Sequence, residues 1–533
     1  MVPVLVLAVL PLCYFAGKLG LLSRARGWRI VMALSFVALA SSLPYGGVDF
    51  AVLKRLDLLI AAAAALVLVG RRLGLGWLRE RKRYLQSLAA LAVASAVVYL
   101  NFFAFHGERT WVHYHDVAHY YLGSKYFREV GYSDLYIAML RAEAELYDNH
   151  FKTIEARDLH SGDLVHIRGL LQTSGPVKAA FTPERWKAFT MDVAYFRDAL
   201  GPQYGNLFQD HGYNPTPLWT LIGGGLANLV PAGSGRGIFF LTLIDPLLVS
   251  AAFAAVAWAF GLETLLIAIS YFCVIFGASF GWTGGAFLRD LWFFGVVVGS
   301  AALAQRRHAL AGALIALAAV LRVFPAFFVA GLFFKGVADV VTTGRVEAGR
   351  GRFLLAFAAS GALLFSSTLV AFGASSWTAF CGNIDRHMQT VSPNIVGLSG
   401  ILAYEARPAQ VSGEELREIQ DRRQRVYHWQ LVSVFLLVLI GVAVASPFLD
   451  DLAAVALGVP LLFFGLNLAS YYYAFLVILV LVNRRHPRRL ALLFVAEALS
   501  YALILFEERE ALLYVYRSLI VLYLLAALAL ERD

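Results

Sequence analysis

Long, uninterrupted apolar runs limit what this chain can fold into more than any other feature of its sequence. Stretches of about 18 or more apolar residues recur along the chain, and each is long enough to cross a hydrocarbon layer about 30 Å thick. Only 15% of the 533 residues are charged, and the mean hydropathy is +0.67. Backbone polar groups in lipid must be satisfied within helices or closed barrels, and continuous runs favour helices. The sequence therefore predicts an all-α integral membrane protein.

Basic loops predict how the first helices are oriented. The loops "SRARGWR" and "RRLGLGWLRERKR" are rich in arginine and lysine, and such loops favour the cytoplasmic side. They separate four expected helices, which cover 2–22, 30–47, 52–70 and 86–104. We expect the first helix to be retained with its N-terminus outside. The polar segment 105–213 is then the first large extracytoplasmic loop.

The rest of the chain predicts further apolar helices and a second outer loop. Three runs follow at 215–232, 237–259 and 261–279, and the charge rule requires that one of them is not a full crossing. The stretch 309–335 predicts a pair of half-membrane helices with Arg322 and Pro325 at the apex. Helices at 286–304 and 353–373 precede the second loop, and five more follow it: 430–446, 452–466, 468–483, 489–506 and 511–529. The result is one polytopic bundle of roughly 11 to 14 transmembrane or re-entrant helices, with outer loops at 105–213 and 374–428.

The net charge of +9 is explained by basic loops beside anionic membrane lipid, so no nucleic acid partner is expected. Sequence signatures of soluble enzymes, such as a phosphate-binding P-loop, a nucleophile elbow or a zinc-protease helix, do not stand out. Chemistry must therefore be sought in the polar loops.

The stretch "TWVHYHDVAHYYLGSKYF" (110–127) places Asp116 just beyond the fourth apolar run, at the start of a helix predicted over 117–130. One interpretation is structural, because aspartate is a favoured helix N-cap. The other is catalytic, with the carboxylate as a general base that takes a proton from an acceptor hydroxyl. A capping carboxylate is also a positioned one, so the two interpretations are compatible.

Three histidines surround this carboxylate, namely His113, His115 and His119. His115 and His119 are four residues apart and would share a helix face, a spacing that suits a metal. A divalent metal held by His115, Asp116 and His119 is therefore one interpretation, although no cofactor is required by any motif. Contacts to an acceptor or sugar, or no special role, are the alternatives.

Further polar residues are candidates for the same site. Asp210 and His211, in "QDHGYNPTPLW", form either an ordinary turn or a second polar wall facing Asp116. Arg322 lies inside an apolar run, where a charge is costly, so we expect it to face a polar cavity or a phosphate; snorkelling to an interface is the alternative. Arg289 and Asp290 would pair with each other. A final group of candidates, which matter only if the second loop folds back over the cavity, comprises Arg386, His387 and Asn394.

In this order, the motifs resemble those of the C-type glycosyltransferases, in particular the bacterial mannosyltransferase-like branch called family 87. The matching pieces are "HDVAHYYLGSKYFREVGYSDLY", "YNPTPLWTLIGGGLANLVP", "LRVFPAFFVAGLFF" and "NIDRHMQTVSPNIVGLSG". The resemblance implies that Asp116 is the first-loop catalytic carboxylate and that Arg322 lies near the lipid phosphate of the donor. Two departures are the separation of Pro215 and Pro217 by a threonine, and "GWTGG" in place of the usual Gly-Gln turn.

The resemblance implies a hexosyltransferase that moves mannose or a similar sugar from a polyprenyl-phosphate donor to a lipid or cell-envelope glycan acceptor. The reaction would take place on the periplasmic face of a bacterial inner membrane and invert the anomeric configuration. Arg322, with His387 or Arg386, would stabilise the departing phosphate, and the acceptor or sugar would contact His113, His115, His119, Asp210, His211 and Asn394. A lipid-linked glycan flippase, and a glycan ligase or polymerase that uses a lipid pyrophosphate, are the alternatives.

Overall fold

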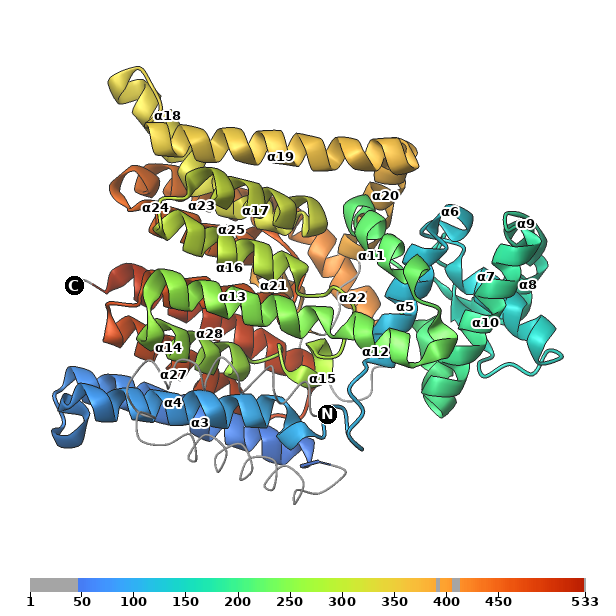
Figure 1. Ribbon diagram of the computed structural model, residues 1–533, viewed down its shortest axis with the longest axis horizontal. Coiled ribbons are helices and arrows are strands. Elements are labelled where there is room, and N and C mark those ends of the chain that lie inside the picture. Colours follow the sequence, from blue (N-terminus) through green and yellow to red (C-terminus); the bar gives the residue numbers. More distant parts are fainter. Residues whose placement is uncertain (1–46, 390–393, 405–412, 532–533) are drawn as a thin grey trace.

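The computed structural model describes residues 47–389, 394–404 and 413–531, and within these ranges the chain is almost entirely helical. Long helices lie side by side in a bundle, and a smaller helical domain stands at one end of it (Figure 1). Five of the described helices are long and apolar enough to cross a membrane: Arg236–Phe260, Phe324–Thr343, Ala348–Phe372, His428–Phe448 and Glu510–Leu530. This agrees with the predicted all-α membrane protein. The predicted helix 2–22, and all but the end of 30–47, lie outside the described residues.

The bundle begins with α3 (Phe50–Arg72) and α4 (Arg81–Tyr99), which correspond to the predicted helices 52–70 and 86–104. The predicted basic loop joins them through η1 (Gly76–Arg79). α3 packs extensively against α27 (Pro487–Leu503), so segments from the two ends of the described chain lie together (Figure 1).

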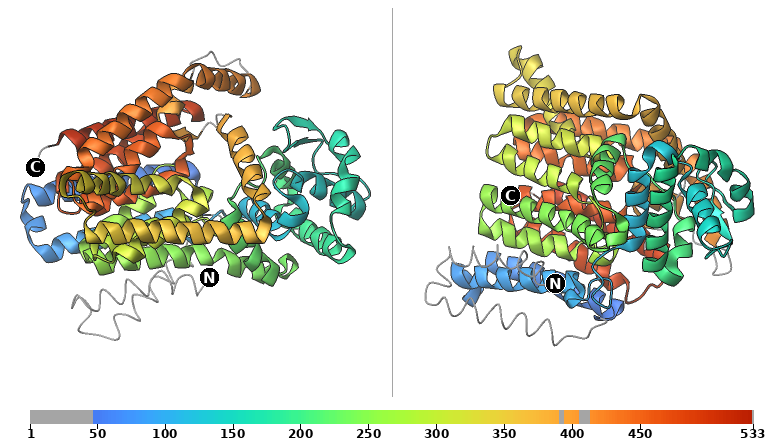
Figure 2. Two further views of the ribbon diagram at one scale, coloured as in Figure 1. Left: turned by 90° about the horizontal axis from the view of Figure 1, so that it is seen from above. Right: turned by 45° about the vertical axis from the view of Figure 1, so that its right-hand side comes forward.

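Residues 105–213, here called the polar domain, form the compact unit at the end of the bundle in every view (Figures 1 and 2). The predicted helix at 117–130 is present as two pieces, α5 (Tyr114–Lys125) and α6 (Phe127–Val130). The other elements are α7 (Leu135–Leu146), the antiparallel strands β1 (Glu155–Arg157) and β2 (Leu164–His166), α8 (Ile167–Gln172), α9 (Ser174–Ala179), α10 (Pro183–Leu200) and η3 (Gly201–Gln209).

Of the three apolar runs after the polar domain, the second is long and apolar enough to cross a membrane: α12 (Arg236–Thr242) with α13 (Ile244–Phe260). α11 (Pro217–Leu229) and α14 (Leu262–Val274) have 13 residues each, about 20 Å of helix. α11 packs against α5, and its buried Leu218 and Trp219 belong to the hydrophobic core that includes the polar domain. That one run is not a full crossing stays a prediction, and α11 and α14 are the two short runs.

A short helix, α15 (Phe280–Thr283), precedes α16 (Leu291–Ala304), so the helix expected at 286–304 starts later than predicted. α17 (His308–Arg322) then meets η5 (Phe324–Val329) and α18 (Ala330–Thr343) at Val323, which has φ 60°. The predicted apex at Arg322 is confirmed. The expected half-membrane length is wrong for the second arm, because Phe324–Thr343 spans 20 residues and is long enough to cross.

The second predicted outer loop folds back onto the bundle. After α19 (Ala348–Phe372) it forms α20 (Ser375–Gln389), β3 (Ile395–Val396), α21 (Leu398–Ala403) and α22 (Gly413–Val426). β3 pairs antiparallel with β4 (Leu468–Ala469), which lies in the final helical region. The five predicted final helices are found as α23 (His428–Ala445), α24 (Asp451–Ala456) with α25 (Gly458–Gly465), η7 (Ser470–Leu476) with α26 (Val477–Val482), α27, and α28 (Glu510–Leu530).

Candidate active site

A cavity of about 570 Å³ lies where the polar domain meets the bundle. Its walls come from α5, from the segment between η3 and α11, from the start of α16, from the turn after α17, and from the β3–β4 pair. Among its lining residues are Asp116, Tyr120, Asp210, Arg289, Arg322, Asn394, Tyr471 and Tyr472. The cavity therefore joins residues that are up to 359 positions apart in the sequence, from His113 to Tyr472.

Asp116 lies in the first turn of α5, where it is 7% exposed. It is not the N-cap, so that prediction is wrong. The N-cap is His113, whose Nδ1 accepts a hydrogen bond from the Asp116 backbone N–H at 3.1 Å. Burial lowers the pKa of His113 to about 4, so its ring is neutral near neutral pH, and the hydrogen bond that Nδ1 accepts places the remaining proton on Nε2. The carboxylate of Asp116 is thus left for other partners.

Arg289 is the partner of Asp116. A guanidinium nitrogen of Arg289 lies 2.9 Å from Oδ1 of Asp116, and both side chains are largely buried. Arg289 also donates to the Trp282 carbonyl and lies 4.8 Å from the ring centre of Tyr471. The expected pairing of Arg289 with Asp290 is therefore wrong. Oδ2 of Asp116 is buried and has no hydrogen-bond partner among the described residues.

Asp245 fixes the backbone that carries Arg289. Its carboxylate, inside α13, accepts hydrogen bonds from the backbone N–H groups of Arg289 at 2.9 Å and Asp290 at 3.0 Å. Asp290 is the N-cap of α16, so Asp245 supplies acceptors for otherwise unsatisfied donors at this helix end. Asp245 is 3% exposed and does not line the cavity. It is a positioning residue for Arg289.

The backbone of the "GWTGG" segment holds the start of α5 in place. The Gly285 carbonyl accepts a hydrogen bond from the His113 N–H at 2.9 Å. Gly285 has φ +66°, and a Cβ at this position would lie 1.8 Å from the Trp111 carbonyl oxygen. Only glycine can allow such a close approach. This segment therefore sets the position of Asp116 through backbone contacts.

Arg322, the last residue of α17, faces the cavity as predicted. Its guanidinium donates to the Tyr120 hydroxyl at 3.5 Å, and it lies 5.6 and 5.8 Å from the ring centres of Tyr120 and Tyr472. Its Nε is buried and has no hydrogen-bond partner in the described part of the chain. Aromatic rings attract a cation without saturating its N–H donors. Arg322 thus keeps donor capacity at the cavity wall.

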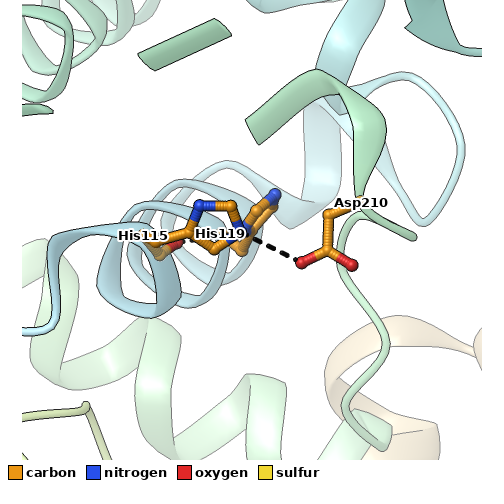
Figure 3. A group of neighbouring side chains, drawn as sticks. All are labelled: His115, His119 and Asp210. Carbon is orange, nitrogen blue, oxygen red and sulfur yellow. Dashed lines mark hydrogen bonds and ion pairs between the residues drawn. The ribbon is translucent and has the colours of Figure 1, made fainter. Parts of the chain in front are cut away.

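His115, His119 and Asp210 gather on a neighbouring part of the wall (Figure 3). His115 Nε2 lies 3.2 Å from Asp210 Oδ2, although the two residues are 95 positions apart. Burial raises the pKa of the Asp210 carboxyl, but the hydrogen bond with His115 and the nearby His119 outweigh it and hold that pKa well below its ordinary value. The predicted second polar wall is therefore present, and Asp210, not Asp116, lies with the two histidines.

The remaining predicted residues divide between two cavities. Asn394 lines the main cavity, and its carbonyl accepts a hydrogen bond from the Ser470 N–H at 2.9 Å. His211 borders both this cavity and a smaller one of about 210 Å³, where Arg386 lies. Arg386 is thus not placed with Arg322. The side chain of His387 lies outside the described residues.

Some residues of this site were missed by sequence reasoning or assigned another role. Arg289 was assigned to an adjacent partner, Asp245 was not distinguished within its apolar run, and the tyrosines of "SYYYAF" were not singled out. An acidic residue in the middle of a membrane-spanning run, as Asp245 is, was the available signal. The contacts that join these residues are long-range and have no local signature.

Comparison with known protein families, curated proteins and solved structures finds no match to this chain. The chemistry of the site must therefore be argued from its own geometry. One buried carboxylate has an oxygen free of protein partners among the described residues, and two buried guanidinium groups border the same space. Such a cavity suits an anionic ligand beside a group that gives up a proton.

Proposed function

We propose that the protein is a membrane glycosyltransferase that transfers a sugar from a polyprenyl-phosphate donor to a hydroxyl of a lipid or glycan acceptor. The observation that carries this proposal is the meeting of Asp116 with Arg289 and Arg322 in one cavity at the end of an apolar bundle. A lipid-linked donor would keep its tail among the helices and its headgroup at this junction. Mannose is favoured only by the resemblance to family 87.

The two arginines suit the donor phosphate. In the ground state, each guanidinium would form charge-assisted hydrogen bonds to phosphate oxygens. As the glycosidic bond breaks, negative charge grows on the departing phosphate, and fixed cations stabilise that charge more in the transition state than before it. Arg322 retains a buried Nε with no partner in the described residues, so its donors are not fully used by the protein.

Asp116 suits the role of general base. Arg289 holds Oδ1 at 2.9 Å, while Oδ2 has no hydrogen-bond partner among the described residues. The acceptor hydroxyl would donate to Oδ2, its oxygen would bond to the anomeric carbon, and the bond from that carbon to the phosphate oxygen would break. The proton ends on Asp116 and the electron pair on the lipid phosphate. A single displacement of this kind inverts the anomeric configuration.

The side of the membrane on which the cavity would lie is inferred from the charges of the loops and not from the residues of the cavity. The basic loop between α3 and α4 would face the cytoplasm, which puts the polar domain and the cavity on the opposite side. In a bacterial cell this is the periplasmic face of the inner membrane. No soluble nucleotide sugar would be needed there, since the donor arrives within the bilayer.

The test is transfer by the full-length protein in nanodiscs. Purified protein would be given a panel of radiolabelled polyprenyl-phosphate sugars and an extract of envelope lipids and glycans. Wild type would be compared with Asp116→Asn and with Asp134→Asn, a matched change at an exposed aspartate that pairs with His160 and does not line the cavity. We expect transfer by wild type and Asp134→Asn, and a loss of at least about 100-fold in Asp116→Asn.

Three other results would redirect the proposal. Equal transfer by all three proteins would remove Asp116 as the base. Movement of labelled lipid across the bilayer without transfer would favour the flippase, and a product lengthened by a whole preassembled glycan would favour the ligase or polymerase.

A further inference from the structure

The structure brings three metal-ligating side chains together on the wall of the main cavity. His115 and His119 are one turn apart on α5, and Asp210 follows η3 as its C-terminal cap. Figure 3 shows the two imidazoles beside each other with the carboxylate directed toward them. One ligand atom from each residue lies within 4.8 Å of the others, and His115 Nε2 is 3.2 Å from Asp210 Oδ2.

We propose that His115, His119 and Asp210 bind a divalent transition metal of the zinc type. Two imidazole nitrogens and one carboxylate oxygen form a ligand set that Zn²⁺ takes in catalytic sites. Ligand atoms around one tetrahedral Zn²⁺ are about 3.3 Å apart, because each bond is about 2.0 to 2.2 Å long. The observed separations need only small side-chain movements to reach that geometry.

Hydrogen bonds around His119 favour the form that a metal requires. His119 Nδ1 lies 2.9 Å from the His115 backbone carbonyl, and Nε2 lies 3.3 Å from the Leu207 carbonyl. A carbonyl can only accept, and the shorter contact favours the proton on Nδ1. Nε2 is then left with its lone pair, 2.8 Å from the Tyr136 hydroxyl. A histidine that donates one N–H to a backbone carbonyl and binds metal through the other nitrogen is the usual arrangement in metal sites. The metal would replace the Tyr136 hydroxyl as the partner of Nε2.

The site has an open side, and that side faces the cavity. Three protein ligands leave a fourth position of a tetrahedral ion for water or substrate. His115 and His119 line the same cavity as Asp116, which is the residue next to His115. An oxygen bound at the fourth position would therefore lie in the same cavity as the carboxylate assigned as the base.

A role for the metal rests on the proposed glycosyl transfer. Bound to the acceptor hydroxyl, the ion would lower the pKa of that hydroxyl and orient its oxygen. Asp116 would then remove the proton as the oxygen bonds to the anomeric carbon and the phosphate leaves. No electron is transferred, and the metal returns to its starting state.

Binding of Zn²⁺ alone tests the site without any substrate. Tag-free, chelator-stripped full-length protein in nanodiscs would be titrated calorimetrically with Zn²⁺, and Co²⁺ absorption would report tetrahedral coordination. We expect one saturable site per chain in wild type. His115→Ala and Asp210→Asn should each weaken binding at least about 10-fold and abolish the Co²⁺ spectrum.

His160→Ala is the matched control, since His160 and Asp134 form an exposed pair at 2.8 Å in the same domain. It should bind Zn²⁺ as wild type does. A titration without a saturable site, or equal affinities in wild type, His115→Ala and Asp210→Asn, would overturn the proposed metal site. The thermal midpoint of each variant, measured first, ensures that only folded protein is compared.

Activity separates this inference from the proposed function. If Zn²⁺ binds at the three residues but no donor supports transfer, the metal site stands and the glycosyltransferase proposal fails. If transfer proceeds unchanged in chelator and in His115→Ala, the catalytic role of the metal fails and the transfer proposal stands. Loss of transfer in chelator, restored by Zn²⁺ in wild type but not in His115→Ala, is the result that we expect.

Discussion

In two arginine–carboxylate pairs of this molecule, the carboxylates differ in how completely they are hydrogen-bonded. In the bundle, Glu497 of α27 and Arg517 of α28 pair at 2.7 Å, and both are about 1% exposed or less. Both oxygens of Glu497 are bonded, with further hydrogen bonds from the Tyr271 hydroxyl at 3.0 Å and the Phe276 N–H at 2.9 Å. At the cavity, Asp116 pairs with Arg289, but one carboxylate oxygen has no hydrogen-bond partner in the described residues.

The difference separates a structural pair from a site that is ready for a ligand. A buried polar atom without a partner costs free energy, so proteins keep few of them. Glu497 joins α27, α28 and the end of α14, and its carboxylate has no unused capacity among the described residues. Asp116 keeps an unpartnered oxygen on the wall of a 570 Å³ cavity. Arg322 and Arg517 each have a buried Nε without a partner among the described residues, but only Arg322 of these two lines that cavity. A ligand that satisfies these atoms would recover the cost.

The largest expected effect comes from neutralising each carboxylate in turn. Asp116→Asn should reduce transfer at least about 100-fold, because it removes the general base. Glu497→Gln should instead lower the free energy of unfolding by about 3 to 5 kcal/mol, because it leaves Arg517 buried without a countercharge. Thermal midpoints and transfer per folded molecule would be measured for both. A Glu497→Gln protein that is stable but inactive would contradict the comparison.

Arg322→Gln should reduce transfer about 100-fold, which is typical for the loss of one donor that stabilises transition-state charge. Initial rates at varied donor concentration would show whether kcat falls more than the apparent affinity does. Arg322→Lys, which keeps the charge but not the planar donor set, should recover part of the rate. Equal rates for Arg322→Gln and wild type would mean that the unused donor of Arg322 serves no ligand.

A smaller effect is expected from Asp245, which positions Arg289 without lining the cavity. The two carboxylate oxygens of Asp245 each accept one backbone N–H at the start of α16, and Asp245→Asn replaces one of these oxygens with an amide group that cannot accept. Since a misplacement of about 1 Å can cost about 100-fold, a shift of roughly half that size at Arg289 should reduce transfer about 10-fold. Ser300→Ala is the control, since Ser300 is buried further along the same helix and, within the described part of the chain, its hydroxyl donates only to the Val296 carbonyl. Equal losses of transfer in Asp245→Asn and Ser300→Ala would contradict the assignment of Asp245 as a positioning residue for Arg289.

The smallest effect concerns the cap of α5. His113→Ala removes the acceptor of the Asp116 N–H and should destabilise the first turn of α5 by about 1 kcal/mol. Amide hydrogen exchange in that turn would then be about 5-fold faster. His113→Asn should restore most of the protection, because asparagine is a favoured N-cap. Faster exchange in His113→Asn than in His113→Ala would contradict the assignment of the cap.

The apolar helices could be predicted well from the sequence, because hydropathy and length determine them directly. α28, expected at 511–529, is observed at Glu510–Leu530, and α3 and α4 are similarly close to their predicted ranges. The polar domain was harder, since its short helices and two-stranded sheet depend on tertiary packing more than on local pattern. The packing of α11 against α5 likewise depends on tertiary contacts that have no local signal in the sequence.

The site was predicted in part. Asp116 and Arg322 stood out because a charge beside or inside an apolar run needs an explanation. Arg289 was misassigned to Asp290 because the two are adjacent, whereas neighbouring side chains at a helix start do not face each other. The contact between His115 and Asp210 spans 95 residues, so no local pattern could reveal it.

The most direct test of the account is a structure of full-length Asp116→Asn in a nanodisc with a polyprenyl-phosphate sugar bound. The substitution should slow transfer enough to trap the donor. We predict that the phosphate lies within hydrogen-bond distance of Arg289 and Arg322, and that the anomeric carbon faces residue 116. A donor headgroup bound elsewhere, with the cavity between the polar domain and the bundle left to solvent, would contradict the account.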